Sequence, residues 1–423
     1  MPLPLDIHRI LEPYYYRLRI LPKIRSTQRD VVHRIQKRGI ARIAFIVSSF
    51  PMWRAQSLYN QLKEDSRFQV IMVINPFWRE SVDQKEKIAE EFRTYFEQEK
   101  MPFADLSNEQ SPGKRLRELF DPDILFYPQP YNDLFGNDID NKFFTDKLIC
   151  YIPYGMLTIG DPWVYKNHLS NIAWRLYLSS EDRKSEAKSI LLNKGKNIRI
   201  TGDLMVDYFS QPTRQDPWKI VDHKRKRIIW APHFSIMPGD HLQRNSFVSL
   251  SSTMLEMVEI YKDTIQFAFK PHPRLKHELY KHPDWGVEKT NEYYRRWEAG
   301  NNTQLEEGSY IDLFNTSDAM IHDCGSFSVE YLFTEKPVMF VSSDINNVTR
   351  SLNDFGAKAL FAHYQGARKE DIIHFIDSVV LKGEDPMREQ RAGFHKRYLT
   401  SPTDKSVADN IYQDLIRSLG FEK

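Results

Sequence analysis

One stretch of the sequence, residues 319–341, carries in order the patterns of a strand, a tight turn, a helix and a second strand. The first apolar run ends at Ile321, the turn covers residues 323–326, and residues 326–333 have the apolar spacing of a helix. A new apolar run follows Pro337. A helix placed between two strands in this way requires a parallel sheet with helices on its faces. This stretch therefore predicts an α/β fold.

The same alternation of strand and helix patterns occurs along most of the chain, in two series. In the first series we expect strands at residues 43–47, 68–74, 124–127, 148–155, 174–178 and 198–202, with helices at 55–63 and 80–100. In the second series we expect strands at residues 228–230, 265–269, 319–321 and 338–341, helices at 251–261, 311–315, 326–333, 369–381 and 406–419, and a loop-rich stretch at 280–308. At 423 residues the chain is also longer than one ordinary core supports. We predict two doubly wound, Rossmann-type domains in series.

The domain boundaries follow from a change in composition. Residues 211–227 are polar, contain two prolines and end in a basic run, which is typical of a linker. We expect a basic N-terminal segment at 1–40, an N-terminal α/β domain at 41–210, this linker, a C-terminal α/β domain at 228–400, and a C-terminal helix at 401–423 that packs back on the N-terminal domain.

The first 40 residues are strongly basic, with nine Lys or Arg against three acids, whereas the whole chain has a net charge of +2. Apolar and aromatic residues are interleaved with these charges, which suits an interfacial segment on an anionic membrane surface. A basic helix packed on the protein's own surface explains the pattern equally well. Nucleic acid is the weaker interpretation, because no RNA- or DNA-binding signature follows.

The composition indicates a globular protein, with 41% hydrophobic and 13% aromatic residues. Two cysteines, Cys150 and Cys324, are too few for a disulfide framework and favour a reducing cytoplasm. No run of about 18 apolar residues occurs, and the first residues lack the charged-then-apolar order of a signal peptide. We expect a cytoplasmic protein, in which residues 1–40 give a peripheral association with the inner face of the cell membrane.

Polar residues follow three strands of the second series. They therefore stand at the carboxyl ends of these strands, where parallel α/β sheets bind their ligands. His233 follows the first strand, His272 and Arg274 follow the second, and Asp323 and Ser326 follow the third. Prolines on both sides of His272 stiffen that loop, and a helix opening at Ser326 presents unpaired N–H groups, so together they suit a phosphate or pyrophosphate. We expect their strands to be neighbours, about 4.8 Å apart. The alternatives are that Ser326 merely caps a helix and that His272 is a structural loop histidine.

Several of these motifs resemble the CDP-glycerol glycerophosphotransferase family, which builds teichoic-acid and capsule-like polymers on a GT-B fold. The resemblance rests on Lys-Pro-His-Pro-Arg at 270–274, Asp-Cys-Gly-Ser at 323–326 and Glu-Lys-Pro-Val at 335–338. Residues 231–233 and a Gly-x-x-x-x-Asp element at 202–207 are also similar to family elements. The resemblance implies two Rossmann-type domains facing a central cleft, with the acceptor on the N-terminal side and the nucleotide donor on the C-terminal side.

The resemblance also implies site residues. His272, Ser326 and Arg274 would bind the pyrophosphate of the donor. The full set of candidate substrate-binding residues is Lys270, His272, Arg274, Asp323, Gly325, Ser326, Ser328 and Glu330. The family usually has a catalytic histidine in a Trp-His-Gly motif, but this chain has Tyr154 at that place. Because a tyrosine with a pKa of about 10 is a poor base, His168 and His233 join Tyr154 as catalytic candidates.

The expected activity is transfer of a polyol phosphate, glycerol phosphate first, from a CDP-activated donor to a hydroxyl of a lipid-linked or polysaccharide acceptor. No metal motif is present, so we expect neither a metal nor a cofactor beyond the CDP-glycerol or related CDP-polyol donor. One rival is a GT-B nucleotide-sugar glycosyltransferase, in which Glu330 binds a ribose. The other is a non-catalytic nucleotide- or glycan-binding module. The sequence does not decide whether the chain forms a homo-oligomer.

Overall fold

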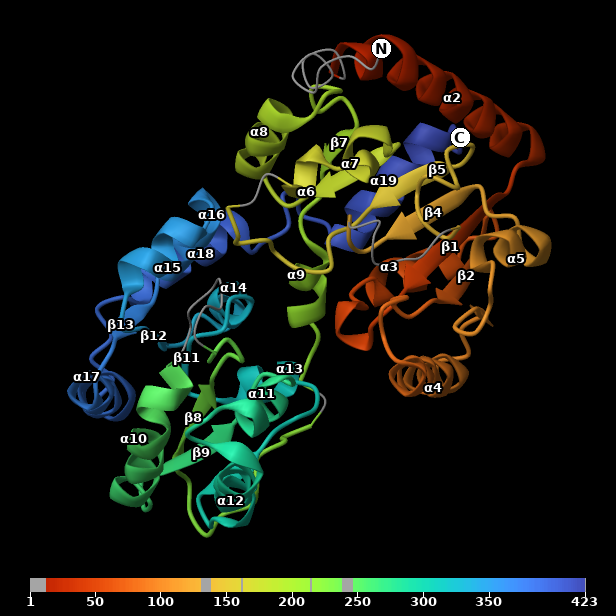
Figure 1. Ribbon diagram of the computed structural model, residues 1–423. Helices are drawn as coiled ribbons and strands as arrows, with labels where there is room; N and C mark the ends of the chain where they lie inside the picture. Colours follow the sequence, from red (N-terminus) through yellow and green to blue (C-terminus); the bar gives the residue numbers. More distant parts are fainter. Residues whose placement is uncertain (1–12, 131–137, 161–162, 214, 238–245, 423) are drawn as a thin grey trace, which may run out of the picture. The chain divides into compact units, whose positions relative to one another are not determined.

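The computed structural model describes residues 13–130, 138–160, 163–213, 215–237 and 246–422. The first twelve residues of the basic segment therefore lie outside the described residues. The chain divides into two compact units (Figure 1). Unit 1 comprises Met1–Gly155, Asp161–Tyr208 and Ser401–Lys423, and unit 2 comprises Met156–Gly160 and Phe209–Thr400.

Unit 1 is built on a parallel sheet with the order β3-β2-β1-β4-β5-β6-β7. Its strands are β1 (Ala41–Val47), β2 (Phe68–Ile74), β3 (Phe103–Asp105), β4 (Ile124–Tyr127), β5 (Leu148–Tyr151), β6 (Arg175–Leu178) and β7 (Ile198–Ile200). Its helices are α2 (Leu21–Arg38), α3 (Gln56–Lys63), α4 (Val82–Gln98), α5 (Pro112–Leu119), α6 (Trp163–Lys166), α7 (His168–Ile172), α8 (Glu181–Ile190), α9 (Leu204–Phe209) and α19 (Val407–Leu419). The order in which strands are added to the sheet reverses between β1 and β4, as in a doubly wound Rossmann sheet.

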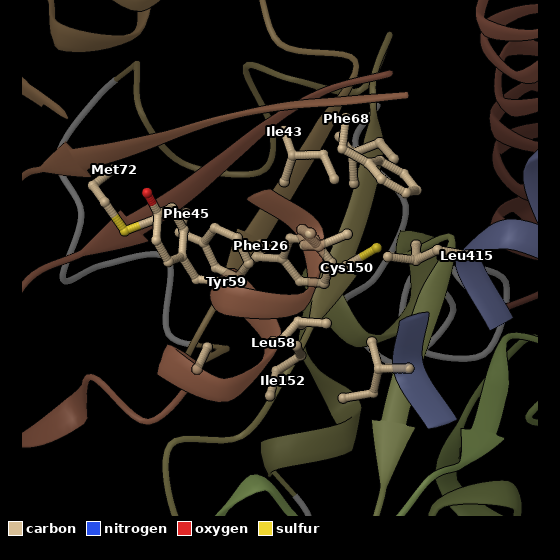
Figure 2. Packing of buried hydrophobic residues seen from close by; sticks show 14 of the residues in the cluster. Ile43, Phe45, Leu58, Tyr59, Phe68, Met72, Phe126, Cys150, Ile152 and Leu415 are labelled. Carbon is tan, nitrogen blue, oxygen red and sulfur yellow. The ribbon is translucent and has the colours of Figure 1, made fainter. Parts of the chain in front are cut away.

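The core of unit 1 forms because its strands are apolar and buried by helices. Phe45 of β1 stacks on Phe126 of β4 with ring centroids 4.6 Å apart (Figure 2). Leu58 from α3 and Leu415 from α19 join the same cluster. Helices distant in the sequence thus share one core with the central strands.

Helix α2 belongs to this core as well. Val31 and Ile35 are fully buried in the cluster, and the helix ends at Gly39 in the left-handed conformation. Pro22 is the second residue of α2 and follows the π-helical segment Tyr16–Ile20 directly, so the helical chain continues through this proline. For these residues the structure shows the second interpretation of the basic segment, a helix packed on the protein's own surface.

Unit 2 repeats the topology with the order β10-β9-β8-β11-β12-β13, again parallel. Its strands are β8 (Lys226–Ala231), β9 (Ile265–Phe269), β10 (Thr303–Leu305), β11 (Ala319–His322), β12 (Val338–Val341) and β13 (Tyr364–Gly366). Its helices are α10 (Ser246–Ile260), α11 (Leu275–Lys281), α12 (Gly286–Ala299), α13 (Ile311–Thr316), α14 (Phe327–Glu330), α15 (Ile345–Ser351), α16 (Asp354–Phe361), α17 (Lys369–His374) and α18 (Arg388–Tyr398). The prediction of two parallel α/β sheets is confirmed.

Successive strand residues of unit 2 pack on opposite faces of the sheet. Trp230 lies in a cluster with residues of α10, α12 and the segment after α17, whereas Ile229 and Ala231 lie in a cluster with residues of α13, α14 and α18. The loop-rich prediction for residues 280–308 was wrong, because this stretch contains α12 and β10. The aromatic residues of α12, such as Trp297, are buried against Phe269.

Residues 156–160 leave the sheet of unit 1 after β5 and belong to unit 2. The backbone N–H of Asn353 donates to the carbonyl of Thr158, and the N–H of Gly160 donates to that of Ser351. Gly356 packs so closely on Thr158 that a Cβ at this glycine would lie 2.5 Å from a backbone oxygen. This segment was expected in the N-terminal domain, but these contacts attach it to α15 and α16.

The C-terminal helix α19 is held in unit 1 by the Gly-x-x-x-x-Asp element. The Asp207 carboxylate accepts hydrogen bonds of 2.8 Å from the backbone N–H groups of Val407 and Ala408, at the first turn of α19. Gly202 has a φ of +91°, and a Cβ there would lie 2.6 Å from Val407. This motif therefore has a structural role in joining α19 to the sheet.

Candidate functional site

The candidate site of unit 2 lies at the point where the strand order reverses, between β8 and β11. Ala231 of β8 is paired with His322 of β11, so the two strands end in register. In doubly wound sheets, ligands bind at the carboxyl ends of the strands beside this reversal. The residues just beyond these two strands therefore form the floor of the site.

Asp323 fastens this floor. One carboxylate oxygen accepts a hydrogen bond of 2.6 Å from the backbone N–H of His233, and the other accepts one from the hydroxyl of Ser246 at the start of α10. Only 1% of Asp323 is exposed. This candidate substrate-binding residue is thus a framework carboxylate that links β8, β11 and α10.

The loop at residues 270–274 follows β9. The ring Nδ1 of His272 accepts a hydrogen bond of 3.1 Å from the backbone N–H of Arg274, so the neutral ring carries its proton on Nε2. Burial, with the nearby charges of Arg274 and Lys270, lowers the pKa of His272 to about 4. At neutral pH His272 is therefore an uncharged ring with one N–H donor.

The side chain of Lys270 makes a hydrogen bond within the protein. Its Nζ donates a hydrogen bond of 2.9 Å to the carbonyl of Gly308, and burial lowers its pKa. Lys270 therefore ties the loop at residues 270–274 to the segment after β10.

A compact group of rings supports Arg274. The guanidinium lies 4.1 Å from the ring centroid of Phe234, and the centroid of Phe234 lies 4.5 Å from that of His272. The rings of His233 and His272 are 5.2 Å apart. The Arg274 side chain is 63% exposed, and its contact with Glu278, at 3.5 Å, is long. Stacking on Phe234 holds a solvent-accessible guanidinium beside His272, a geometry suited to phosphate.

The turn after β11 leads into the short helix α14 and a following 3₁₀ turn, Tyr331–Thr334. Ser326 is exposed and makes no side-chain cap bond, so the capping alternative does not describe it. Within the described residues, the N–H groups of Gly325 and Ser326 donate no backbone hydrogen bond. The hydroxyl of Ser328 donates to the Gly325 carbonyl, and the Glu330 carboxylate accepts from the Tyr310 hydroxyl at 2.5 Å. Ser326 is thus exposed and Gly325 partly exposed, whereas Ser328 and Glu330 are buried supports.

The expected spacing of these motifs needs a correction. The order β10-β9-β8-β11 places β8 between the strand before His272 and the strand before Ser326. Their strands are therefore separated by two intervals, about 9.6 Å, and not by one. His233, after the intervening strand, lies between the two motifs. A ligand that contacts both must extend over His233.

Unit 1 has its own pocket at the corresponding reversal, between β1 and β4. Tyr154, 38% exposed, lines it together with Ser48 and Arg54. The backbone N–H of Tyr154 donates to the carbonyl of Pro128 after β4. The guanidinium of Arg54 lies 4.8 Å from the ring centroid of Tyr208. Arg54 was not predicted from the sequence, because it follows a short 3₁₀ turn with no motif around it.

His168 does not line the pocket that Tyr154 lines. Its Nδ1 lies 2.9 Å from the hydroxyl of Tyr16, which precedes α2. Burial, with a smaller effect of Lys142, lowers the pKa of His168 to about 4. This hydrogen bond gives His168 a structural part in attaching the N-terminal helix.

Phe234 and Ser246 were not predicted as site residues either, because their roles depend on contacts with Arg274 and Asp323. Among the described residues, no group of three or more His, Cys, Asp or Glu is arranged to hold a metal ion.

Comparisons with known proteins agree with this geometry. Residues 219–417 match the model of the family described as CDP-Glycerol:Poly(glycerophosphate) glycerophosphotransferase. No curated protein matches the chain. A structure of S. aureus MnaA with UDP is 16% identical, with a TM-score of 0.59, over 90% of this chain and 98% of that chain. The UDP-GlcNAc 2-epimerase from Neisseria meningitidis bound to UDP-GlcNAc is 15% identical, with a TM-score of 0.57, over 89% and 100%.

A variant of the wall teichoic acid polymerase TagF soaked with CDPG is 11% identical, with a TM-score of 0.57, over 98% of both chains. These likenesses show the fold, which is GT-B-like with two Rossmann-type domains. The part of the chain holding His272, Arg274 and Ser326 thus matches the CDP-Glycerol:Poly(glycerophosphate) glycerophosphotransferase family model, as its motifs indicated.

Proposed function

We propose that this chain is a transferase that moves glycerol phosphate from CDP-glycerol to a hydroxyl of a surface-polymer precursor and releases CMP. The observation that carries the proposal is the position of His272 and Arg274 beside the reversal between β8 and β11, inside the region that matches the family. The TagF structure soaked with CDPG supports the donor class, because it shares the fold over nearly the whole chain.

The reaction requires stabilisation of charge at the phosphates. The acceptor oxygen forms a bond to the β-phosphorus, the bond from that phosphorus to the bridging oxygen breaks, and CMP leaves with the electron pair. The proton of the attacking hydroxyl passes to a base. Arg274, the Nε2–H of His272 and the N–H groups of the turn at residues 325–326 supply donors for the phosphate oxygens. Such positioned donors stabilise the charge that develops on the leaving group.

Of the three catalytic candidates, His168 is engaged by the hydroxyl of Tyr16, so His233 and Tyr154 are the two considered for the reaction. The Nδ1 of His233 accepts a hydrogen bond from the backbone N–H of Ser235, which leaves the proton of the neutral ring on Nε2. His233 therefore suits donation to a phosphate better than proton abstraction. Tyr154 lines the pocket of unit 1, where we propose that the acceptor binds.

The function is tested by incubating the protein with an acceptor and a panel of donors: CDP-glycerol, CDP-ribitol, a CMP-sugar and UDP-GlcNAc. We expect CMP release with CDP-glycerol, and loss of this release in a His272→Ala/Arg274→Ala double variant. The matched control is His277→Ala/Arg295→Ala, which removes an exposed histidine and an exposed arginine of the same unit. Absence of CMP release from every cytidine donor contradicts the proposal.

A nucleotide-sugar glycosyltransferase is the second candidate, favoured by the buried Glu330 held by Tyr310 at 2.5 Å. In this case the panel gives UDP release from UDP-GlcNAc. Binding of a nucleotide without any release instead indicates a non-catalytic module.

The cellular position is part of the proposal. No helix among the described residues is long and apolar enough to cross a membrane. We propose that the basic face of α2 and the residues before it associate with the inner face of the cell membrane, where a lipid-linked acceptor is available.

A further inference from the structure

A second pocket lies in unit 1, between α2 and the loops that precede β6 and β7. It has a volume of about 430 Å³, within the range of small-molecule sites. Because lining residues 171–174, 193, 196 and 197 come before these strands, the pocket lies at the amino ends of β6 and β7. The ligand edge of a Rossmann sheet is the opposite one, and a four-residue strand spans about 13 Å. The pocket thus lies at the edge of the unit 1 sheet opposite the pocket that Tyr154 lines, and it shares no lining residue with the candidate site of unit 2.

The lining of this pocket is basic. Arg25 and Arg29 lie one turn apart on α2, and Lys196 lies on the loop before β7. None of the described residues that line the pocket is Asp or Glu. The side chains of Arg25, Arg29 and Lys196 have no hydrogen bond or ion pair with another described residue. Three cations thus surround one hollow without a carboxylate to balance them.

The walls of the pocket are fixed by amide side chains. The Nδ2 of Asn197 donates to the carbonyls of Ser170 and Ala173, and the Nδ2 of Asn193 donates to the carbonyl of Asn171. These bonds join the loop before β6 to the loop before β7. On the other side, the Nε2 of Gln28 donates to the carbonyl of Ile172 at 2.8 Å and holds α2 in place. The hollow is therefore preformed.

Arg175 also lines the pocket, but unlike Arg25 and Arg29 its guanidinium is already bonded within the protein. Its Nε donates to Asp414 at 2.8 Å, its guanidinium lies 4.1 Å from the ring centroid of Trp174, and it also donates to the hydroxyl of Ser418. Arg199 donates to the same Asp414 carboxylate at 3.0 Å. One carboxylate thus balances two guanidinium groups, which leaves the surroundings of the pocket positive.

We propose that this pocket binds a phosphodiester anion through Arg25, Arg29 and Lys196. Guanidinium groups match the paired oxygens of a phosphate, and the apolar wall formed by Ile24, Val32 and Trp174 accommodates the carbon chain beside it. Two sources share this chemistry: a soluble phosphodiester and the head group of phosphatidylglycerol. The proposal rests on the charge and shape of the pocket and does not depend on the proposed transferase activity.

The test uses two probes and two charge-matched variants. Glycerophosphoglycerol, a soluble diester, is titrated calorimetrically at low salt, and co-sedimentation is measured with vesicles of phosphatidylglycerol and phosphatidylcholine against phosphatidylcholine alone. The pocket variant is Arg25→Gln/Arg29→Gln. The control is Lys87→Gln/Lys114→Gln, which removes the same charge from exposed positions of unit 1 on α4 and α5, outside both the pocket and α2. Circular dichroism and thermal melting confirm that both variants are folded.

We expect the pocket variant to lose about tenfold or more in binding to at least one probe relative to the control, because charge-assisted bonds to phosphate are lost. Loss of the soluble diester identifies a soluble source, and loss confined to vesicles identifies the lipid head group. CDP-glycerol binding should be unchanged in the pocket variant, which separates this result from failure of the donor site. If the parent binds neither probe, or if both variants bind alike, the proposal is overturned.

Discussion

The backbone N–H of His233 donates a 2.6 Å hydrogen bond to the carboxylate of Asp323, and this bond joins the ends of β8 and β11 where the strand order reverses. The bond fixes the backbone that carries Phe234, on which Arg274 stacks. The geometry of the candidate donor site therefore depends on a carboxylate that need not touch the ligand.

We predict that Asp323→Asn weakens both stability and donor binding. The amide keeps one acceptor oxygen but loses the charge that two donors share, so we expect about 1–3 kcal/mol less free energy of unfolding and weaker CDP-glycerol binding. Urea unfolding and calorimetric titration measure the two effects. Asp354→Asn, an exposed change on α16, is the control. Parent-like values for Asp323→Asn would show that the floor does not need this charge.

The donor-phosphate residues should rank by the strength of their contacts. His272→Ala and Arg274→Ala should each weaken CDP-glycerol binding about tenfold or more, since each removes a donor to charged oxygens. Ser326→Ala should cost less, because the N–H groups of the turn remain. Titration of CDP-glycerol into each variant gives the ranking. If His272→Ala and Arg274→Ala both bind CDP-glycerol with the affinity of the parent, the phosphate site lies elsewhere.

Asp207 and Gly202 should matter for stability and not for donor binding. Asp207→Ala removes two backbone hydrogen bonds at the start of α19, and we expect a loss of about 1–2 kcal/mol in the free energy of unfolding. Gly202→Ala should also destabilise, because its φ of +91° and its closeness to Val407 both disfavour a Cβ. Denaturant unfolding measures both, with Arg417→Ala, at an exposed position of the same helix, as the control. A drop in CDP-glycerol affinity without a drop in stability would argue against this structural role.

Acid should destabilise the protein through buried neutral histidines. Burial lowers the pKa of His363 to about 3, and the Nδ1 of this ring lies 2.8 Å from the carbonyl of Ala359. As the pH falls below about 6.5, the unfolded chain binds a proton that the folded ring does not, so stability is full above this pH and is lost between about 6.5 and 3. One such group contributes a slope of up to about 1.4 kcal/mol per pH unit.

The variant His363→Gln replaces the ring N–H with an amide N–H donor that does not titrate. We expect its unfolding free energy to fall less steeply than that of the parent between pH 6.5 and pH 4. Unfolding curves at several pH values provide the measurement, and identical slopes in the two proteins would exclude His363 as a source of the acid sensitivity.

Tyr154→Phe should leave turnover within about tenfold of the parent and donor affinity unchanged. The substitution keeps the ring that lines the pocket of unit 1 and removes only the hydroxyl. Since general acid–base groups contribute typically about 10²–10⁴-fold, a rate loss of this size would make Tyr154 a proton-transfer residue. Initial rates of CMP release at saturating donor decide between the two outcomes.

The sequence by itself determined the class of the fold and the motifs of the donor site. The strand at residues 68–74 was expected with the bounds it has as β2, and the apolar runs before residues 270 and 323 were identified as strands that end in polar loops. These features depend on residues close together in the chain, where hydrophobic period and proline position act directly on the backbone. The family resemblance rests on the same local motifs.

Only the tertiary structure decided how these local elements combine. It placed β8 between β9 and β11, which set His233 between the two phosphate motifs and doubled their expected spacing. It showed that Asp323 is buried framework, that residues 156–160 belong to unit 2, and that Asp207 caps α19 from 200 residues away in the sequence. Each of these outcomes depends on which distant segments pack together, and the free energy of that packing is not contained in the pattern of any single segment.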